Sequence, residues 1–203
     1  MSRLQLGTRI LCVLLMYALS TGLAWSAGGG KVKVKSVDGR VLVVLKRDGE
    51  RVKIEDGSGN LLLKGKPRDN GGRKYKGPYG DAQVKVTGSG GGFKLKTERG
   101  GLLWKVKLRD KRISIANNDE GTLADELRHT KKDKWVLDWD GEPQGKVKRY
   151  PEKNKIKVKD KSGRELYQVK GQPLSPMYAV LLIPRIPPEQ AYVIMAEMWL
   201  RGW

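Results

Sequence analysis

The chain has 203 residues, with 41 lysines and arginines against 22 acidic residues, and a formal net charge of +19. Its single cysteine excludes an internal disulfide, and its single histidine excludes a metal site built from several histidines. Catalysis through a Ser–His or Cys–His pair would have to use His129. The length allows one domain of ordinary size.

Residues 1–27 have the features of a secretory signal peptide. Arg3 and Arg9 precede an apolar run from residue 10 to 19, and small residues near Ser26 and Ala27 suit cleavage after either of these two. The alternative is an uncleaved anchor, but this run is well short of the roughly 20 residues that span a bilayer. We therefore predict export to the periplasm or the extracellular space, with no transmembrane span in the mature chain.

The predicted mature chain differs from the whole in two ways. Residues 1–27 contain two arginines and no acid, so their removal leaves 176 residues with a formal charge of +17. The only cysteine, Cys12, is removed with them. A chain without thiols suits an oxidising compartment, and its fold must be held by its core alone.

Residues 28–173 contain a repeat of about 20 residues. Glycines recur at positions 39, 59, 80, 100, 121, 141 and 163, spaced by 20 to 22 residues. An apolar residue lies four to six positions before each glycine: Val34, Ile54, Tyr75, Leu95, Ile115, Leu137 and Val158. A second apolar series lies two positions earlier, and Arg73 is its exception. Seven such units indicate a repeat architecture.

Each unit reads as a β-hairpin. Lysines alternate with apolar residues in 31–35 and 155–159, which is typical of a strand with one buried face. A turn such as Asp160–Gly163 follows, in which Asp supplies a side-chain hydrogen bond and Gly a positive φ. The chain therefore predicts an all-β antiparallel meander of up to 14 strands. To bury its apolar face, such a sheet must curl into a barrel, fold into a sandwich or cover another element. Of these we expect a barrel-like sheet with the C-terminal helix packed in or against it.

Residues 174–203 form a C-terminal segment of the same domain, but they break this pattern. An apolar run at 177–183 is followed by prolines and then by a predicted helix at 189–200. From Ala191 on, Glu197 is the only charged residue of that helix, and a helix that is apolar all round is buried in protein or lipid. It is too short to cross a bilayer. We expect it to be enclosed by the sheet, the alternative being an interfacial membrane anchor.

A meander of hairpins such as 155–170 around a hydrophobic helix such as 188–200 resembles the tubby-like superfamily, which includes the tubby C-terminal domain, the phospholipid scramblases and the LURP-one-related proteins. The resemblance implies a barrel around a central helix and an interaction with phosphoinositides or other lipids. The family barrel has twelve strands, whereas the repeat here predicts up to 14. The turn at 160–164 is also similar to the Asp-x-x-Gly-Arg turns of secreted Rhs-type repeat shells, although their Tyr-Asp pair is absent here.

No motif in the chain indicates catalysis, a cofactor or a metal. Asp138 and Asp140 lie on one side of a predicted strand and could serve a carboxylate-dependent hydrolase. However, Asp138 also occupies the turn position of its repeat. His129 lies among cations without a suitably spaced carboxylate, and we interpret it as an exposed residue at a strand end. Among the tryptophans, Trp104 and Trp135 occupy core positions, whereas Trp139 is expected to be exposed.

The positive charge is distributed over every hairpin. The predicted anion-binding face consists of Lys146, Lys148, Arg149, Lys155, Lys157 and Lys159. We expect a non-enzymatic protein that binds anionic lipid or another envelope polyanion. Export makes a specific nucleic acid partner unexpected. The alternative is a structural or scaffold module whose charge only keeps it soluble, and a hydrolase using Asp138 and Asp140 is the least favoured function.

Overall fold

The computed structural model describes residues 29–69, 71–88, 90–117, 124–171 and 173–203. The predicted signal peptide (residues 1–27) and the repeat glycine at 121 lie outside these residues. Within them the chain forms fourteen strands, two 3₁₀ helices and one α-helix. The elements are β1 (Gly30–Ser36), β2 (Val41–Asp48), β3 (Arg51–Asp56), β4 (Leu61–Pro67), β5 (Arg73–Lys76), β6 (Ala82–Thr87), β7 (Gly92–Lys96), β8 (Leu102–Arg109), β9 (Arg112–Ala116), β10 (Asp125–Lys131), β11 (Lys134–Trp139), β12 (Glu142–Tyr150), η1 (Pro151–Lys153), β13 (Lys155–Asp160), β14 (Glu165–Lys170), η2 (Pro176–Leu182) and α2 (Pro188–Leu200).

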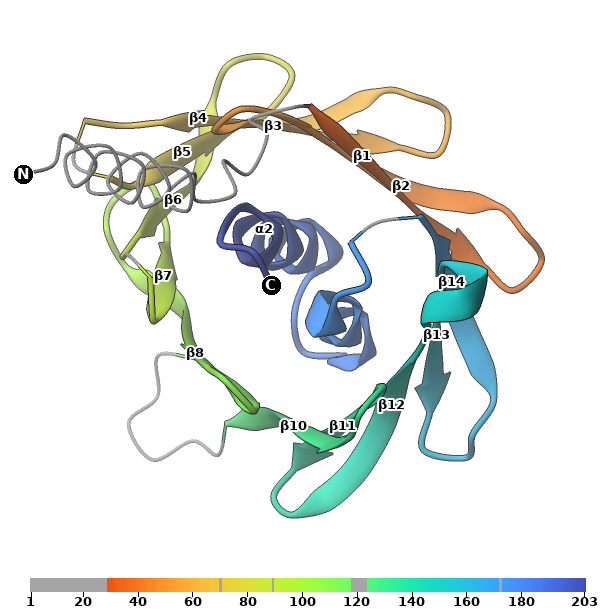
Figure 1. The fold of residues 1–203 in the computed structure, drawn as a ribbon. Coiled ribbons are helices and arrows are strands. Elements are labelled where there is room, and N and C mark those ends of the chain that lie inside the picture. The colour runs from red at the N-terminus through yellow and green to blue at the C-terminus, as the bar shows by residue number, and fades with distance from the viewer. Residues whose placement is uncertain (1–28, 70, 89, 118–123, 172) are drawn as a thin grey trace, which may run out of the picture.

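The strands form one closed antiparallel barrel. Each strand pairs with its neighbours in the chain, and β1 pairs with β14 to close the sheet, with Val34 opposite Val169 (Figure 1). Closure removes the free sheet edges that a long meander would otherwise expose. The all-β hairpin meander predicted from the repeat is confirmed, and among the possible shapes it adopts the barrel.

Alternation within the strands sorts side chains between the two faces of the wall. In β13, Ile156 and Val158 are fully buried, whereas the alternating Lys155, Lys157 and Lys159 are partly exposed on the outer face. The turns follow the predicted chemistry. In the turn after β3, the Asp56 carboxylate accepts hydrogen bonds from the backbone N–H groups of Ser58 and Asn60 at 2.9 and 2.8 Å, and Gly59 has φ +92°. Local sequence thus sets both the strand faces and the reversals.

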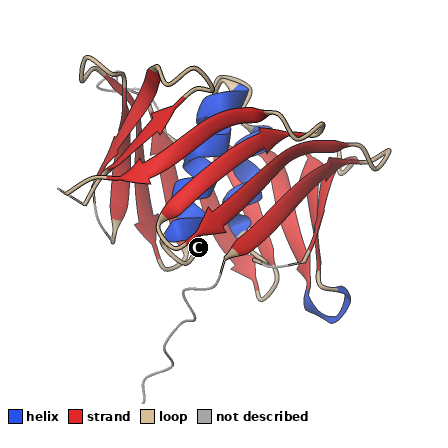
Figure 2. Cartoon of the chain, turned by 90° about the horizontal axis from the view of Figure 1, so that it is seen from above, coloured by secondary structure: helices blue, strands red, loops and turns tan. Residues whose placement is uncertain are grey.

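The C-terminal segment fills the interior of the barrel (Figures 1 and 2). The apolar run at 177–183, to which the sequence assigned no element, forms most of η2, and Ser175 caps it by accepting a hydrogen bond from the backbone N–H of Met177. In α2, Ile194 and Met198 are fully buried, Trp199 is nearly so and Tyr192 is partly buried. The enclosed helix is therefore confirmed.

Two glycines on the wall allow close packing inside the barrel. A Cβ on Gly145 in β12 would lie 2.7 Å from a methyl carbon of Leu182 in η2. A Cβ on Gly65 in β4 would lie 2.7 Å from the ring of Tyr75 in the neighbouring strand β5. Both distances are far below van der Waals contact, so Gly145 makes room for η2 and Gly65 for the Tyr75 side chain.

A polar network inside the barrel joins the wall to α2. Arg73, the exception in the apolar series, faces inward, and its guanidinium donates to the Glu197 carboxylate at 3.2 Å. The hydroxyl of Tyr75 donates to the same oxygen at 2.7 Å, and Arg201 forms an ion pair with the other oxygen. Glu197 is fully buried. Burial and the Glu197 carboxylate raise the pKa of Tyr75 well above its ordinary value, which keeps its hydroxyl a donor.

Candidate functional site

The structure brings most of the predicted anion-binding residues together on the outside of β12 and β13. Lys146 lies opposite Lys159, and Lys148 lies opposite Lys157. Lys155 lies at the same face, opposite Tyr150. Between these rows, Val147 and Val158 face the core.

Arg149 is placed differently from the other five. It pairs in register with the buried Ile156, so it lies on the inner side of the wall at the end of β12. Its guanidinium donates to the carbonyl oxygen of Lys132 at 2.8 Å and to that of Leu174 at 3.4 Å, and it forms an ion pair with Asp133 at 3.2 Å. Arg149 therefore belongs to the mouth of the barrel, whereas the five lysines belong to its outer face.

Lysines face lysines across much of the outer wall. These registered pairs include Lys31 with Lys46, Lys46 with Lys53, Lys53 with Lys64, Lys64 with Lys76, Lys74 with Lys85, Lys85 with Lys96, Lys94 with Lys105, Lys134 with Lys148, and Lys148 with Lys157. Directly opposed side chains have Cβ atoms about 4.5–5.5 Å apart, and like charges at that distance repel. Among the described residues of these pairs, only Lys46, Lys74 and Lys157 form ion pairs, with Glu55, Glu98 and Glu165.

The carboxylates considered for hydrolysis have separate structural roles. Asp138 is buried, and its carboxylate accepts a hydrogen bond from Arg128 at 2.6 Å and forms an ion pair with it. Asp140 is an exposed turn residue with φ +52°. Both border a depression of about 470 Å³ on the outer face that Arg112 and Arg128 also line. Asp138 is thus engaged with Arg128, whereas Asp140 reverses the chain.

The tryptophans lie where their repeat positions predict. Trp104 and Trp135 are both buried, and the indole N–H of Trp104 donates to Gln190 at 2.6 Å. Trp139 is 45% exposed, and the guanidinium of Arg185 lies over its ring, 5.4 Å from the centroid. Core packing explains the first two, and the exposure predicted for Trp139 is confirmed.

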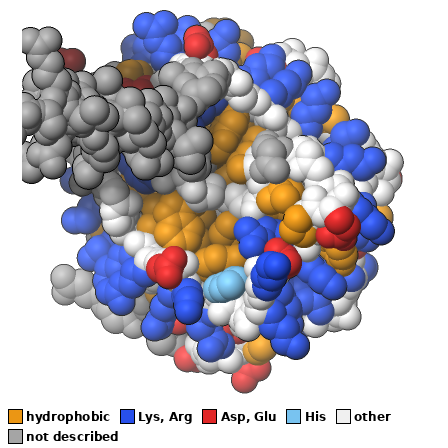
Figure 3. Space-filling view, in the orientation of Figure 1, with side chains coloured by type: hydrophobic (Ala, Val, Ile, Leu, Met, Phe, Trp, Pro, Cys, Tyr) orange, Lys and Arg blue, Asp and Glu red, His pale blue; other side chains and the backbone are white. Residues whose placement is uncertain are grey.

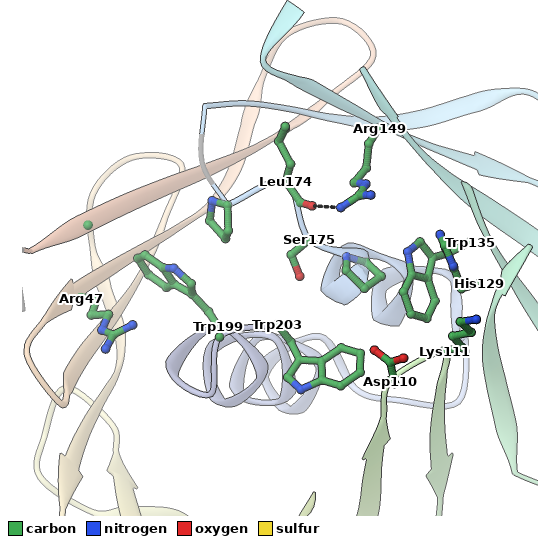
Figure 4. A pocket seen from close by; sticks show the side chains of 14 residues that line it. Arg47, Asp110, Lys111, His129, Trp135, Arg149, Leu174, Ser175, Trp199 and Trp203 are labelled. Atoms are coloured by element: carbon green, nitrogen blue, oxygen red, sulfur yellow. Dashed lines mark hydrogen bonds between the residues drawn. The ribbon is translucent and has the colours of Figure 1, made fainter. Parts of the chain in front are cut away.

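A cavity of about 770 Å³ lies at one end of the barrel. We call this end of the barrel the C-terminal mouth. The start of β1, the ends of β2, β8, β10 and β12, and the C-terminal residues surround it (Figure 4). It is lined by Gly30, Arg47, Asp110, Lys111, His129, Trp135, Arg149, Pro173, Leu174, Ser175, Pro176, Trp199, Gly202 and Trp203. The lining combines aromatic rings, prolines and cations.

Aromatic contacts organise one side of this mouth. His129 in β10 lies opposite Trp135 in β11, with their ring centroids 4.9 Å apart. Trp203, the last residue, meets the Trp135 ring edge to face at 6.3 Å. Across the cavity, a Cβ on Gly30 would lie 2.7 Å from the Trp199 ring, so β1 begins in direct contact with α2. His129 is partly buried in this cluster, which differs from the exposed strand end expected from the sequence.

The rim of the cavity carries both cations and a carboxylate. Arg47, Lys111, Arg149 and Asp110 line it, and Arg149 already forms an ion pair with Asp133 at 3.2 Å. The Arg47 side chain donates to the carbonyl oxygen of Gly49 at 2.9 Å. Within the described part of the chain, neither Arg47 nor Lys111 has a carboxylate partner. Figure 3 shows apolar side chains at the centre of this end of the molecule and Lys and Arg side chains around them.

Sequence reasoning missed this site because its residues are scattered over five strands, the turn between β8 and β9, and the C-terminal segment. One signal was present for Arg149: it follows the inward-facing Val147 by two positions, so strict alternation puts it on the inner face. For Arg47 and Lys111, by contrast, only closure of the barrel shows that their strand ends meet the tail.

Comparisons with known proteins give limited information. No protein-family model matches the chain, and the search of curated proteins found no match. Two chains of solved structures match, one of them in the X-ray structure of a protein from Arabidopsis thaliana. It has 17% sequence identity, the match covers 83% of this chain and 91% of that chain, and the TM-score is 0.39.

Two further properties concern the described residues alone. None of the helices there has the length and apolar character needed to cross a membrane. In the same part of the chain, no group of three or more histidine or acidic side chains is arranged to hold a metal ion.

Proposed function

We propose that the protein is an exported, non-enzymatic barrel that binds membranes rich in anionic lipids. The binding face is the outside of β12 and β13, with Lys146, Lys148, Lys155, Lys157 and Lys159. The observation that carries this proposal is the register of lysine opposite lysine, which recurs around the wall and on β12 and β13 brings these five lysines onto one outer face. Solubility does not require that arrangement, because interspersed charges of both signs keep a surface soluble without repulsion between neighbours.

Against an anionic surface, the attraction between these lysines and the headgroups would offset the repulsion among the lysines. Each lysine near such a surface contributes roughly 1 kcal/mol of binding free energy. The attraction falls off within the Debye length, about 8 Å at physiological ionic strength, so it acts only when the face lies against the headgroups. Lys157 is the weakest contributor of the five, because its ammonium already pairs with Glu165, whose hydrogen bond raises the pKa of Lys157.

The tubby-like resemblance is part of this proposal. It is supported by an antiparallel barrel that encloses a C-terminal helix, and it implies an interaction with lipids. The fourteen strands differ from the twelve of that family, and we transfer no binding residue from it.

Co-sedimentation with vesicles tests the proposal. The protein is expected to bind vesicles of phosphatidylglycerol and phosphatidylcholine at low salt, to release them as salt rises, and to ignore phosphatidylcholine alone. The test variant is Lys146→Glu with Lys148→Glu on β12. Its matched control is Lys94→Glu with Lys96→Glu on β7, which has the same spacing and the same change of charge.

The β12 variant is expected to lose roughly 30-fold in affinity or more, given two lysines at about 1 kcal/mol each, and the β7 control far less. Equal losses in the two variants would show that total charge, and not this face, determines binding. No binding to anionic vesicles at low salt would overturn the function and favour a scaffold with a solubilising surface.

A further inference from the structure

We propose that the cavity at the C-terminal mouth binds one molecule of a single-chain anionic amphiphile, with its alkyl chain on the tryptophans and its head group at the cationic rim. This site is separate from the outer face of β12 and β13 and does not depend on it. The shared chemistry is one acidic head, either carboxylate or phosphate, on one unbranched chain.

The size and construction of the cavity suit a small molecule. Its volume of about 770 Å³ lies in the range of roughly 300–1,000 Å³ that is common for ligand sites. Its walls are strand ends of a closed barrel, the turn between β8 and β9, residues 173–176 and the end of the packed helix α2 with the residues that follow it (Figure 4). The strand ends and α2 are held by the barrel before a ligand arrives, which reduces the entropic cost of binding.

The inner lining is apolar and borders the core directly. Trp135 and Trp199 belong to the core cluster, and Leu174 and Trp203 pack against it. Pro176, also in the lining, is buried. Apolar side chains that border an open cavity gain free energy when an apolar group displaces water from them. An alkyl chain on this surface would continue the core outward.

The rim supplies positive charge from two directions. Arg47 lies beside Trp199, and Lys111 lies beside His129 and Trp135 (Figure 4). Arg149 reaches in from β12, with part of its charge already balanced by Asp133. In addition, the Nε atom of Arg149 is buried without a hydrogen-bond partner. An unsatisfied buried donor is costly, so an acceptor oxygen that reached it would gain more than one bound in water. This combination favours an anionic head group over a neutral one.

The ring geometry argues for a flexible chain and against a flat aromatic ligand. The His129 and Trp135 planes are inclined by 42°, and those of Trp135 and Trp203 by 71°. A flat ligand stacks best between parallel faces, whereas a chain adapts to an irregular surface. A wholly polar anion would leave the tryptophans uncovered. An amphiphile would cover the tryptophans with its alkyl chain and place its acidic head group at the cationic rim.

Titration calorimetry and tryptophan fluorescence test this inference. Because residues 1–27 are predicted to be cleaved on export, the mass of the purified protein is measured first to establish which residues it contains. The probes, used below their micellar concentrations, are dodecanoate, lauroyl lysophosphatidylglycerol and the neutral monolauroylglycerol. Acetate and glycerol phosphate serve as heads without a chain. We expect saturable one-to-one binding of at least one of the two anionic amphiphiles and no binding of the heads alone. The tighter of the two anionic probes identifies the head group.

Charge-reversal variants locate the ligand. Arg47→Glu and Lys111→Glu are each expected to weaken binding roughly tenfold to a hundredfold, since each removes a charged contact. Lys94→Glu on the outside of β7 is the matched control and should bind like the parent. Trp203→Ala should also weaken binding, and circular dichroism is measured on this variant to establish that its fold is intact, because Trp203 also packs against Trp135.

Three results would overturn the inference. One is the absence of saturable binding for both anionic probes. Another is equal affinity for monolauroylglycerol, which would remove the role of the cationic rim. The third is an effect of Lys94→Glu as large as that of Arg47→Glu, which would place the ligand elsewhere. None of these results bears on the vesicle experiment, so the two proposals fail separately.

Discussion

Replacement of Glu197 by leucine tests how the helix is held inside the barrel. The carboxylate accepts hydrogen bonds from Arg73 and Tyr75 on the wall and forms an ion pair with Arg201 at the end of α2. In Glu197→Leu, the guanidinium of Arg73 stays in the interior, where its side chain is only 9% exposed. It then carries an uncompensated charge, whereas Arg201 still contacts the Phe93 ring.

The structure sets the size of the effect. Removing one partner of a buried ion pair costs about 3–5 kcal/mol, because the other charge stays desolvated. For a chain of this length each kilocalorie lowers the melting temperature by about 2–4 °C, which gives a decrease of roughly 6–20 °C. The double variant Arg73→Leu with Glu197→Leu removes both charges and should recover much of the loss, because buried pairs can often be replaced by apolar residues.

Urea unfolding followed by tryptophan fluorescence, with the slope and midpoint fitted separately, measures both variants. The double variant should be clearly more stable than the sum of the two single changes predicts. If Glu197→Leu unfolds within about 1 kcal/mol of the parent, or if the double variant shows simple additivity, the interior network does not hold the helix.

Three other predictions concern packing and pH. Gly145→Leu should destabilise the barrel by about 1–3 kcal/mol, because its Cβ would lie 2.7 Å from Leu182, and its melting temperature should fall accordingly. Gly91 has open space around it, so Gly91→Ala should leave the melting temperature nearly unchanged. Burial raises the pKa of Asp125 from 3.8 to about 6, so its stabilising contribution is full below pH 4 and is lost as pH rises through 6. Asp125→Asn should remove that decline in urea titrations, and an unchanged slope would contradict the assignment. The hydrogen bond from Ser162 holds the pKa of Asp160 below its ordinary value, so Asp160→Asn should reduce the loss of stability below about pH 4.

The repeat made the architecture predictable because its determinants are local. Alternation in β13 and the Asp56 turn each lie within a few residues, and seven copies reinforce one another. Closure is not local, since Val34 meets Val169 across nearly the whole domain. It could still be anticipated, because an apolar face needs cover and the C-terminal helix is apolar all round.

The ion pair between Arg73 and Glu197 is an example of a contact that could not be predicted from the sequence. Each residue was visible as an exception, one in the apolar series and one in the helix, and an inward cation with an interior anion is a recognisable combination. Their contact depends on the rotation of α2 about its axis, which short-range patterns do not determine. The cavity depends similarly on the position of the C-terminal residues in space. Trp203 packs against Trp135, which contacts His129, and this cluster leaves His129 partly buried.

Closure of β1 onto β14 has a consequence for the order of folding. The wall is synthesised first, and its last strand and the helix that fills it come at the end. Until η2 and α2 enter, the inward side chains of every hairpin have no complete cover, so early compact states expose apolar surface. Contacts between the first and last strands must also wait for the whole chain, which makes folding slow. A chain interrupted before residue 174 would therefore form a wall without the segment that fills it. We expect such a chain to be degraded by proteases or to aggregate.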